Sequence, residues 1–268
     1  MKPITFLSDY GYEDEFAGVC RAVIERIAPG APVIDLSHGV PARDVRRGAF
    51  ALAAALPYAP EGIHLAVVDP GVGTSRRPVA VAIADSDRVL VGPDNGLLSV
   101  ALERFGGPAE AVDLSDSRFR LEPVSATFHG RDVFAPVAAR LALGASLADA
   151  GEPIDPASLA RIAERRAVVG DEHVAAHVAN FDGFGNAVLD LPAEQVPEGL
   201  FWVGTPVVIG EGTETEGVFG RTFADAPDGG ALVYVDSTGN LAIAVNGGSA
   251  REALGFEVDQ QVLIRLAR

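Results

Sequence analysis

Cysteine is nearly absent from this sequence, because only Cys20 among its 268 residues carries a thiol. A single cysteine excludes an internal disulfide and any zinc site built from several thiolates. Long apolar runs are also missing: the alanine- and leucine-rich stretch Ala49 to Leu56 falls far short of the ~18–20 residues that a membrane span needs. The N-terminus reaches Asp9 too soon for the apolar centre of a signal peptide. We therefore expect a soluble, cytoplasmic protein with no membrane partner.

Positive charge is scarce. Lys and Arg together number 21 against 37 Asp and Glu, which gives a formal net charge of −16. Such a chain repels nucleic-acid phosphates, and no basic stripe in the sequence counters that repulsion. The composition therefore favours a small neutral or cationic ligand over nucleic acid. With 48% hydrophobic residues, it also argues against intrinsic disorder.

The first half of the chain alternates between short apolar segments and segments with helical spacing. We expect strands at Ile4–Leu7, Val33–Leu36, Ile63–Val68, Val79–Ala84 and Val89–Val91. We expect helices at Phe16–Ile27, Asp44–Leu56, Leu97–Phe105 and Asp132–Leu143. This alternation predicts an N-terminal α/β domain, with a mainly parallel sheet and helices on both of its faces.

The pattern changes after about residue 150. Pro156 to Arg166 is interpreted as a connecting helix, and only short strand-like segments follow, separated by glycine-rich turns. These segments are His173–Ala179, Val203–Ile209, Leu232–Val235, Leu241–Val245 and Val262–Leu266. They are typical of a smaller all-β sandwich or barrel. We therefore predict an α/β catalytic domain over residues 1–155, a linker over 156–166 and a β-barrel domain over 167–268.

Two expected strands end in an aspartate followed by a glycine turn. They are Asp9 with Gly11 and Asp69 with Gly71. Ligands of parallel sheets bind beyond the carboxyl ends of the strands, so these aspartates are candidates for chemistry. The loop 69–77 lacks the lysine of a P-loop and the glycine spacing of a dinucleotide site. An arginine in it would favour the charged form of Asp69, and a structural ion pair is the alternative interpretation.

His129 is the second candidate, in a loop directly before an expected helix. A histidine can exchange a proton near neutral pH, although a loop histidine is more often a polar surface residue. His38 has the same two interpretations with fewer charged companions. His64 follows an apolar residue and is interpreted as structural.

Motifs of common metal and serine-hydrolase sites are missing. The five histidines show neither HExxH nor HxH spacing, and the pair His173 and His177 has no evident third ligand. No Gly-x-Ser-x-Gly nucleophile turn occurs. Phe184 and Phe223 beside turns of the second domain could stack on a purine or hold a cation, although core packing is the simpler interpretation for either. We predict neither a metal nor another cofactor.

Several motifs occur together in an order that resembles a known family. They are Ser8-Asp9-Tyr10-Gly11, Val68–Thr74 with Arg76-Arg77, Gly92–Leu98, Thr127–Asp132, Asp182–Asn186, Thr222–Asp225 and Asn246–Ala250. This set resembles the S-adenosyl-L-methionine (SAM) hydroxide adenosyltransferases, also called adenosine-forming SAM hydrolases, which are related to fluorinases and chlorinases. The resemblance covers nearly the whole chain. It implies an N-terminal α/β domain and a C-terminal β-barrel, assembled as a homotrimer with ligand sites between the N-terminal domain of one subunit and the C-terminal domain of a neighbour.

The resemblance also implies a reaction, in which water or hydroxide displaces methionine from the ribose C5′ of SAM and yields adenosine and L-methionine. The catalytic residues that it implies are Asp69, Arg76 and His129, with Arg77 as an alternative to Arg76. Asp69 and His129 are expected to polarise and orient the water, and Arg76 to fix Asp69 and stabilise hydroxide character. The halogenating relatives carry other residues at the aspartate and histidine positions, which favours water over halide as the nucleophile.

For substrate binding, the resemblance implies that Asp9 grips the ribose diol, since a carboxylate can accept from two neighbouring hydroxyls. It also implies Asp182 and Asn186 near the methionine amino end and the adenine, and Phe223 beside the adenine. Ser237 is implied at the methionine carboxylate, Asn246 and Gly247 at the adenine edge, and Asn95 as a further substrate-binding residue. Thr238 departs from the halogenase pattern, where an arginine follows, so how the carboxylate is held stays open. The alternative functions are a halide-using SAM-dependent transferase and a non-catalytic adenosine- or SAM-binding protein.

Overall fold

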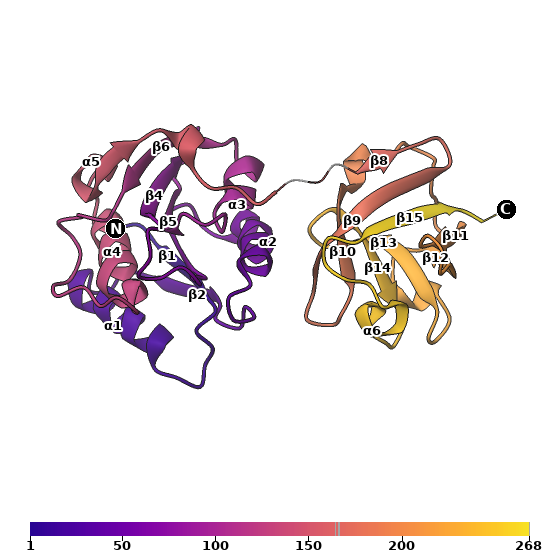
Figure 1. The fold of residues 1–268 in the computed structure, drawn as a ribbon, viewed down its shortest axis with the longest axis horizontal. Coiled ribbons are helices and arrows are strands. Elements are labelled where there is room, and N and C mark those ends of the chain that lie inside the picture. The colour runs from indigo at the N-terminus through magenta and orange to yellow at the C-terminus, as the bar shows by residue number, and fades with distance from the viewer. Residues whose placement is uncertain (164, 166, 268) are drawn as a thin grey trace. The chain divides into compact units, whose positions relative to one another are not determined.

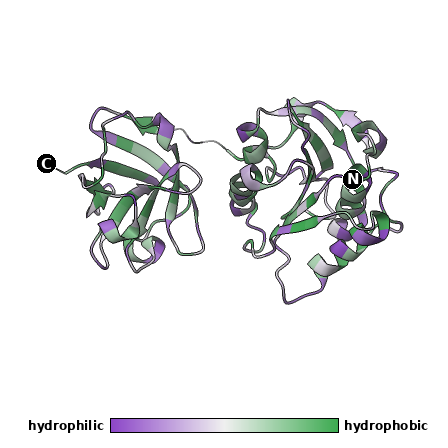
Figure 2. Ribbon diagram, turned by 180° about the vertical axis from the view of Figure 1, so that it is seen from behind, coloured by the Kyte–Doolittle hydropathy of each residue, from purple (hydrophilic) through white to green (hydrophobic). Residues whose placement is uncertain are grey.

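The computed structural model describes residues 1–163, 165 and 167–267. It divides the chain into two compact units, Met1–Ile162 and Ala163–Arg268 (Figure 1). Apolar residues follow the strands of each unit and polar residues its loops, as Figure 2 shows. Within the described parts of the chain we find no helix whose length and apolar character would let it cross a membrane.

A seven-stranded mixed sheet forms the centre of unit 1. In order across the sheet its strands are β2 (Val33–Ser37), β1 (Ile4–Ser8), β3 (Ile63–Val67), β5 (Val89–Pro93), β4 (Pro78–Ile83), β6 (Pro108–Asp113) and β7 (Glu152–Ile154). The first four run parallel, and the remaining three pair antiparallel. The connection from β4 to β5 is too short for a parallel crossover, so these two strands form a hairpin. β1 and β3 are buried along their full length, as strands covered on both faces must be.

Helices cover both faces of this sheet. On one face α1 (Phe16–Ile27) packs with α4 (Ala135–Ala142) over a core that includes Phe6, Leu65 and Phe134. On the other face α2 (Val45–Ala55) packs with α3 (Ser99–Arg104) over Leu7, Leu90 and Val68. A π-helical turn at Gly130–Phe134 leads into α4, and α5 (Leu147–Ala150) follows it.

Seven strands of unit 2 close into a barrel. Around the ring they are β10 (Ala187–Pro192), β14 (Asn240–Val245), β13 (Ala231–Val235), β12 (Thr215–Phe219), β11 (Pro206–Ile209), β15 (Gln261–Leu266) and β9 (His173–Phe181), and the pairing of β9 with β10 completes the closure. The short β8 (Val168–Val169) extends the sheet beyond β9, and α6 (Ala250–Leu254) follows β14. Side chains such as Val178, Leu189 and Ile243 fill the interior. The predicted fold class, an α/β unit followed by a smaller barrel-like unit, is confirmed.

The segment after β7 crosses unit 1 as an extended strap, defined here as residues 155–162. The predicted helix over 156–166 is wrong for the described residues: Pro156–Ser158 form a single 3-10 turn, and Glu164 and Arg166 lie outside the described residues. Helix formation fails because side chains of unit 1 take the backbone donors of the strap. Asp94 accepts from Ala160 N (2.7 Å), and Ser99 Oγ accepts from Ile162 N (3.1 Å).

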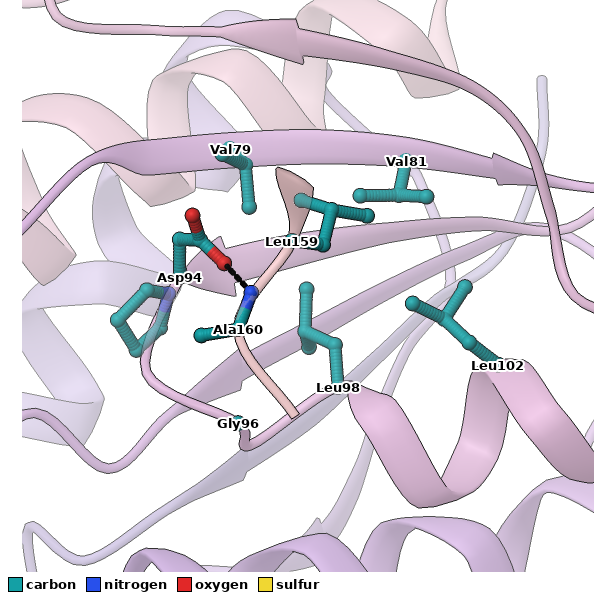
Figure 3. Close-up of a pocket in the computed structure, with 9 residues that line it drawn as sticks. Val79, Val81, Asp94, Gly96, Leu98, Leu102, Leu159 and Ala160 are labelled. Atoms are coloured by element: carbon teal, nitrogen blue, oxygen red, sulfur yellow. Dashed lines mark hydrogen bonds between the residues drawn. The ribbon is translucent and has the colours of Figure 1, made fainter. Parts of the chain in front are cut away.

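The strap covers a small pocket in unit 1. Figure 3 shows Leu159 and Ala160 of the strap facing Val79, Val81 and Leu98. The cavity volume of ≈10 Å³ is at the lower limit for one water molecule and far too small for a nucleoside. This pocket is therefore part of the packing of the strap, and the candidate site lies elsewhere in unit 1.

Candidate active site

The three predicted catalytic residues come from loops far apart in the chain and meet at one place in unit 1. Asp69 lies just beyond β3, Arg76 precedes β4, and His129 directly precedes the π-helical turn. The loop that carries Asp69 and Arg76 meets the loop before His129 at Gly73. The backbone of Gly73 (φ 74°) lies so close to Ala126 O that a side chain there would collide with that carbonyl, so only glycine permits this approach.

Arg76 grips Asp69 with two donors. Its Nε donates to Asp69 Oδ1 (3.0 Å), and its Nη2 is paired with Asp69 Oδ2. Both side chains are nearly buried, with exposed fractions of 7% for Arg76 and 6% for Asp69. The guanidinium also lies 5.4 Å from the ring centroid of Phe134. Such a fork fixes both the position and the orientation of the carboxylate.

The same guanidinium reaches the histidine. Arg76 Nη2 lies 3.2 Å from Nδ1 of His129. An arginine has no acceptor, so Nδ1 must accept, and the proton of the neutral imidazole is on Nε2. Burial lowers the pKa of His129, and the neighbouring Arg76 cation lowers it further. His129 is therefore neutral near pH 7, with an N–H on the side of the ring away from Arg76.

Asp132 braces the loop that carries His129. Its Oδ2 accepts from Ser125 N (2.9 Å), and its backbone carbonyl accepts from Leu121 N (2.7 Å). Burial raises the pKa of Asp132, but the hydrogen bonds from Arg131 and Ser125 outweigh burial and hold that pKa below its usual value. Asp132 is thus a charged anchor for the loop, a role that the sequence analysis did not give it, although it lies three residues after His129.

Asp9 and Tyr10 border the same region at the end of β1. Asp9 Oδ2 accepts from Arg43 N (2.8 Å), and burial, followed by the nearby Asp69 charge, raises the pKa of Asp9. The Tyr10 hydroxyl lies against the backbone of Gly130, next to His129, and burial raises the pKa of Tyr10 well above its ordinary value. The sequence analysis gave Tyr10 no role, although its position next to Asp9 at a strand end was an available signal.

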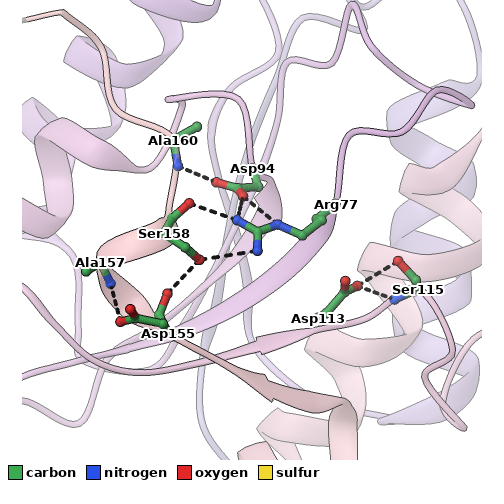
Figure 4. A network of polar contacts seen from close by, with 8 residues as sticks. All are labelled: Arg77, Asp94, Asp113, Ser115, Asp155, Ala157, Ser158 and Ala160. Atoms are coloured by element: carbon green, nitrogen blue, oxygen red, sulfur yellow. Dashed lines mark hydrogen bonds and ion pairs between the residues drawn. The ribbon is translucent and has the colours of Figure 1, made fainter.

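Arg77 has different partners from Arg76. Its Nε and Nη2 donate to Asp94 Oδ2 (3.0 and 2.6 Å), and Nη2 also donates to the carbonyl of Ser158 in the strap (2.9 Å; Figure 4). Arg77 therefore fastens the strap, and Arg76 is the arginine that faces Asp69.

Asn95, predicted as a substrate-binding residue, braces the backbone near the site. Its Nδ2 donates to Val68 O (2.9 Å), one residue before Asp69, and its Oδ1 accepts from Leu97 N (3.1 Å). Both ends of this side chain are thus bonded to the main chain.

Four of the predicted binding residues of unit 2 lie in turns near the open end of the β13–β14 hairpin, where Ala231 pairs with Val245. They are Asp182, Asn186, Asn246 and Gly247. Asp182 closes its own turn, because it accepts from Asn186 N (2.9 Å) and Asn186 Nδ2 (2.8 Å). Asn246 Nδ2 donates to Ala226 O (2.8 Å), directly after the 3-10 turn that starts at Phe223. Gly247 follows Asn246, in a left-handed conformation (φ 72°) with open space around it.

Phe223 and Ser237 complete the predicted set. Phe223 is 47% exposed, and its ring lies edge-on to that of Tyr234, with 5.5 Å between the centroids. Burial raises the pKa of Tyr234 to about 12, with further contributions from Asp182 and Asp236. Ser237 lies in the turn of the β13–β14 hairpin, at the opposite end from Asn246.

No group of three or more His, Cys, Asp and Glu side chains within residues 1–163, 165 and 167–267 is arranged to hold a metal ion. The site in unit 1 holds a carboxylate, a guanidinium and a neutral imidazole together. A carboxylate can accept a hydrogen bond from a small polar molecule, and an imidazole N–H can donate one to it.

Comparisons with known proteins show which family the chain resembles. The sequence model of the SAM hydroxide adenosyltransferase N-terminal domain matches residues 4–151, and that of the C-terminal domain matches residues 176–263. An (R)-S-adenosyl-L-methionine hydrolase of Salinispora arenicola is 47% identical over 97% of both chains, and one of Thermus thermophilus is 44% identical over 96% of this chain and 97% of the relative. A fluorinase of an Actinoplanes species is only 27% identical, over 91% of this chain and 90% of the relative.

Solved structures match the whole fold. A crystal structure of an uncharacterized conserved protein from Thermotoga maritima has a TM-score of 0.89 and 36% identity, and covers 97% of this chain and 99% of that chain. A conserved hypothetical protein from Thermus thermophilus has a TM-score of 0.79 and 41% identity over 100% of both chains. Both family domains and the nearly full-length relatives lead to one conclusion: the chain belongs to the SAM hydroxide adenosyltransferase family.

Proposed function

We propose that this protein hydrolyses SAM to adenosine and L-methionine by attack of water on the ribose C5′. The observation that carries the proposal is the convergence of Asp69, Arg76 and His129 around one guanidinium, in a chain of this family. Because the curated relatives are named for (R)-SAM, we propose the same epimer as the preferred substrate.

The reaction forms a C5′–O bond and breaks the C5′–S bond. The sulfonium leaves as the neutral thioether of methionine, and the proton of the attacking water is released, so that one H⁺ appears for each SAM consumed. Since the leaving group needs no proton, the main task of the protein is to align water behind C5′ and to exclude competing solvent.

The three residues divide this task by their hydrogen-bonding capacity. Each carboxylate oxygen of Asp69 keeps a free lone pair beside its bond to Arg76, so Asp69 can accept a hydrogen from the water. His129, neutral and protonated on Nε2, can donate to the water oxygen and fix its orientation. We therefore assign proton acceptance to Asp69, and the orientation of both partners to Arg76.

Substrate binding completes the proposal. We assign the ribose diol to Asp9, and the adenine and methionine ends to the unit 2 residues Asp182, Asn186, Phe223, Ser237, Asn246 and Gly247, with Asn95 as a brace. Support comes from the family resemblance and from the distribution of these residues over both units. The resemblance also supports a homotrimer in which unit 2 of a neighbouring subunit completes each site. The cytoplasmic location stays a prediction from the sequence.

The test is incubation of the purified protein with (R)-SAM, and separately with the other epimer, in ¹⁸O-labelled water. We expect adenosine and methionine in equal amounts, one proton released per turnover, and the label in the 5′-hydroxyl of adenosine. A parallel reaction with excess chloride tests the halide alternative. A chlorinated nucleoside as the main product, or tight binding without any product, would overturn the proposal.

A further inference from the structure

His38 is a buried histidine that the proposed chemistry leaves unused. It follows β2 and lies beside the end of β1, because these parallel strands end at the same edge of the sheet. Its side chain is 2% exposed and Ser8 is fully buried. Nδ1 of His38 lies 2.7 Å from Ser8 Oγ, a short contact between two side chains 30 residues apart.

His38 is hydrogen-bonded to residues on both sides of Asp9, namely Ser8 before it and Gly11 after it. The His38 carbonyl accepts from Gly11 N (2.8 Å), and Ser8 Oγ, bound to the imidazole, accepts from Tyr10 N (3.3 Å). The turn that presents Asp9 is thus held before and after the aspartate by one residue that directly follows a neighbouring strand.

The protons in this group can be placed from the hydrogen-bonding capacity of each atom. Ser8 Oγ accepts from Tyr10 N and has a second lone pair, so this contact alone does not set the tautomer of His38; the Asp35 carboxylate beside Nε2 favours a proton there, and the Ser8 hydroxyl then donates to Nδ1. Nδ1 is then the acceptor, and the proton of the neutral ring is on Nε2. Nε2 lies 3.2 Å from Asp35 Oδ1, outside hydrogen-bond geometry, and Asp35 is also paired with Arg21.

Ser8, His38 and Asp35 are the residue types of a serine-hydrolase triad, but the geometry does not permit that chemistry. Ser8 Oγ is fully buried, so a substrate carbonyl cannot approach it. One of the two lone pairs of this oxygen is also engaged by Tyr10 N. A nucleophile needs an accessible oxygen with a free lone pair aimed at the substrate, so this group holds the chain in place and forms no covalent intermediate.

We infer that His38 is a positioning residue for ribose recognition: through Ser8 and Gly11 it fixes the turn that presents Asp9 to the substrate diol. The inference rests on the proposed function, which assigns the ribose diol to Asp9. It predicts that the loss of the His38 contact weakens binding of the diol and leaves the water-activating group around Arg76 intact.

Two substitutions of His38 separate this role from general destabilisation. H38N keeps an amide oxygen near the position of Nδ1 and can still accept from Ser8, whereas H38Q carries its amide one carbon further out and loses that contact. We expect H38Q to raise KM for SAM about tenfold, with kcat changed less than about threefold. H38N should keep KM near the wild-type value. If H38Q does not fold, S8A, which removes the same contact from the other side, takes its place in the comparison.

The decisive measurement is binding of adenosine and of 2′,3′-dideoxyadenosine by calorimetry, which requires no turnover. In wild type the diol should favour adenosine, and D9N should abolish that preference. H38Q should reduce the preference about tenfold by weakening adenosine binding alone, and H38N should restore it. A structural defect would instead weaken both ligands equally.

The outcomes distinguish the two proposals. If D9N abolishes the preference and H38Q keeps it at the wild-type value, His38 does not position Asp9 and the inference is overturned, while the role of Asp9 stands. If the wild type shows no preference for the diol, or D9N keeps it, the assignment of Asp9 fails and the inference fails with it.

Discussion

Arg76 Nη2 and His129 Nδ1 lie 3.2 Å apart, and this contact decides what the histidine can do. An imidazole whose Nδ1 accepts from a guanidinium presents only an N–H donor from its other nitrogen while it is neutral. The general-base role often given to an active-site histidine is therefore closed to His129 at this nitrogen. In the proposed mechanism, this leaves the carboxylate held by the same guanidinium as the proton acceptor.

We predict that R76K lowers kcat by about 10²-fold or more, the effect of removing one preorganised donor from a reaction centre. A lysine has one compact ammonium and cannot span both oxygens of Asp69 and Nδ1 of His129. The matched control is R77K, in the neighbouring residue that binds Asp94 and the strap. It should keep kcat within about threefold of wild type. Steady-state kinetics on (R)-SAM measures both, and a larger loss in R77K than in R76K would contradict the assignment.

The pH dependence of the reaction follows from the lowered pKa of His129. Protonation at Nδ1 would break the contact with Arg76 and place two cations side by side, so activity should fall as pH drops through this pKa. Because the pKa is below the ordinary value of 6.5, kcat should stay constant from neutral pH to below 6.5 before it declines. The pH–rate profile measures this, and a decline centred above pH 6.5 would contradict it.

The same contact can be tested in the free protein. The Arg76 cation is one of the causes that lower the pKa of His129, so R76Q should raise that pKa. An NMR titration of the imidazole Cε1 proton, assigned by its loss in H129Q, gives the value in both proteins. A pKa that is unchanged or lower in R76Q would show that the guanidinium does not act on this ring.

The sequence was sufficient for the parts of the fold that rest on local pattern. β1 and β3 are short apolar runs, and α1 has helical spacing, so these elements were predicted within a residue or two. β12 (Thr215–Phe219) was missed because it begins with threonine, glutamate and glycine, which are typical of a turn. Its strand conformation depends on pairing with β11 and β13, which the local sequence does not show. The antiparallel half of the unit 1 sheet was missed because the direction of β4 depends on its hairpin with β5.

The candidate site shows the same division. Asp69, Arg76 and His129 could be selected because their motifs occur together in order along the chain. The choice between Arg76 and Arg77 could not be made, since the two neighbours have different partners and only the fold shows that Arg76 meets Asp69 and Arg77 meets Asp94. His38 looked isolated because its partner Ser8 comes from another strand.

Gly130 is predicted to be sensitive to the smallest substitution. A Cβ at this position would collide with the Tyr10 hydroxyl and would lie 3.0 Å from Tyr10 Cζ. G130A must therefore displace Tyr10 or His129, and we expect kcat to fall about tenfold or more. The double variant Y10F/G130A removes the hydroxyl and should recover part of that loss. If the double variant is no more active than G130A, the collision is not the cause.

Burial of His64 predicts an acid-sensitive stability that is independent of catalysis. This side chain is fully buried, its Nδ1 lies 2.9 Å from Thr5 Oγ1, and burial lowers its pKa to about 4. Between pH 6.5 and pH 4 the unfolded chain therefore binds a proton at this position and the folded chain does not, so stability falls as the pH falls. A pKa lowered from 6.5 to about 4 corresponds to roughly 3 kcal/mol. Urea unfolding followed by circular dichroism at a series of pH values should show a shallower loss in H64N, which keeps an amide near Thr5 but does not titrate in this range. Equal slopes for wild type and H64N would contradict the prediction.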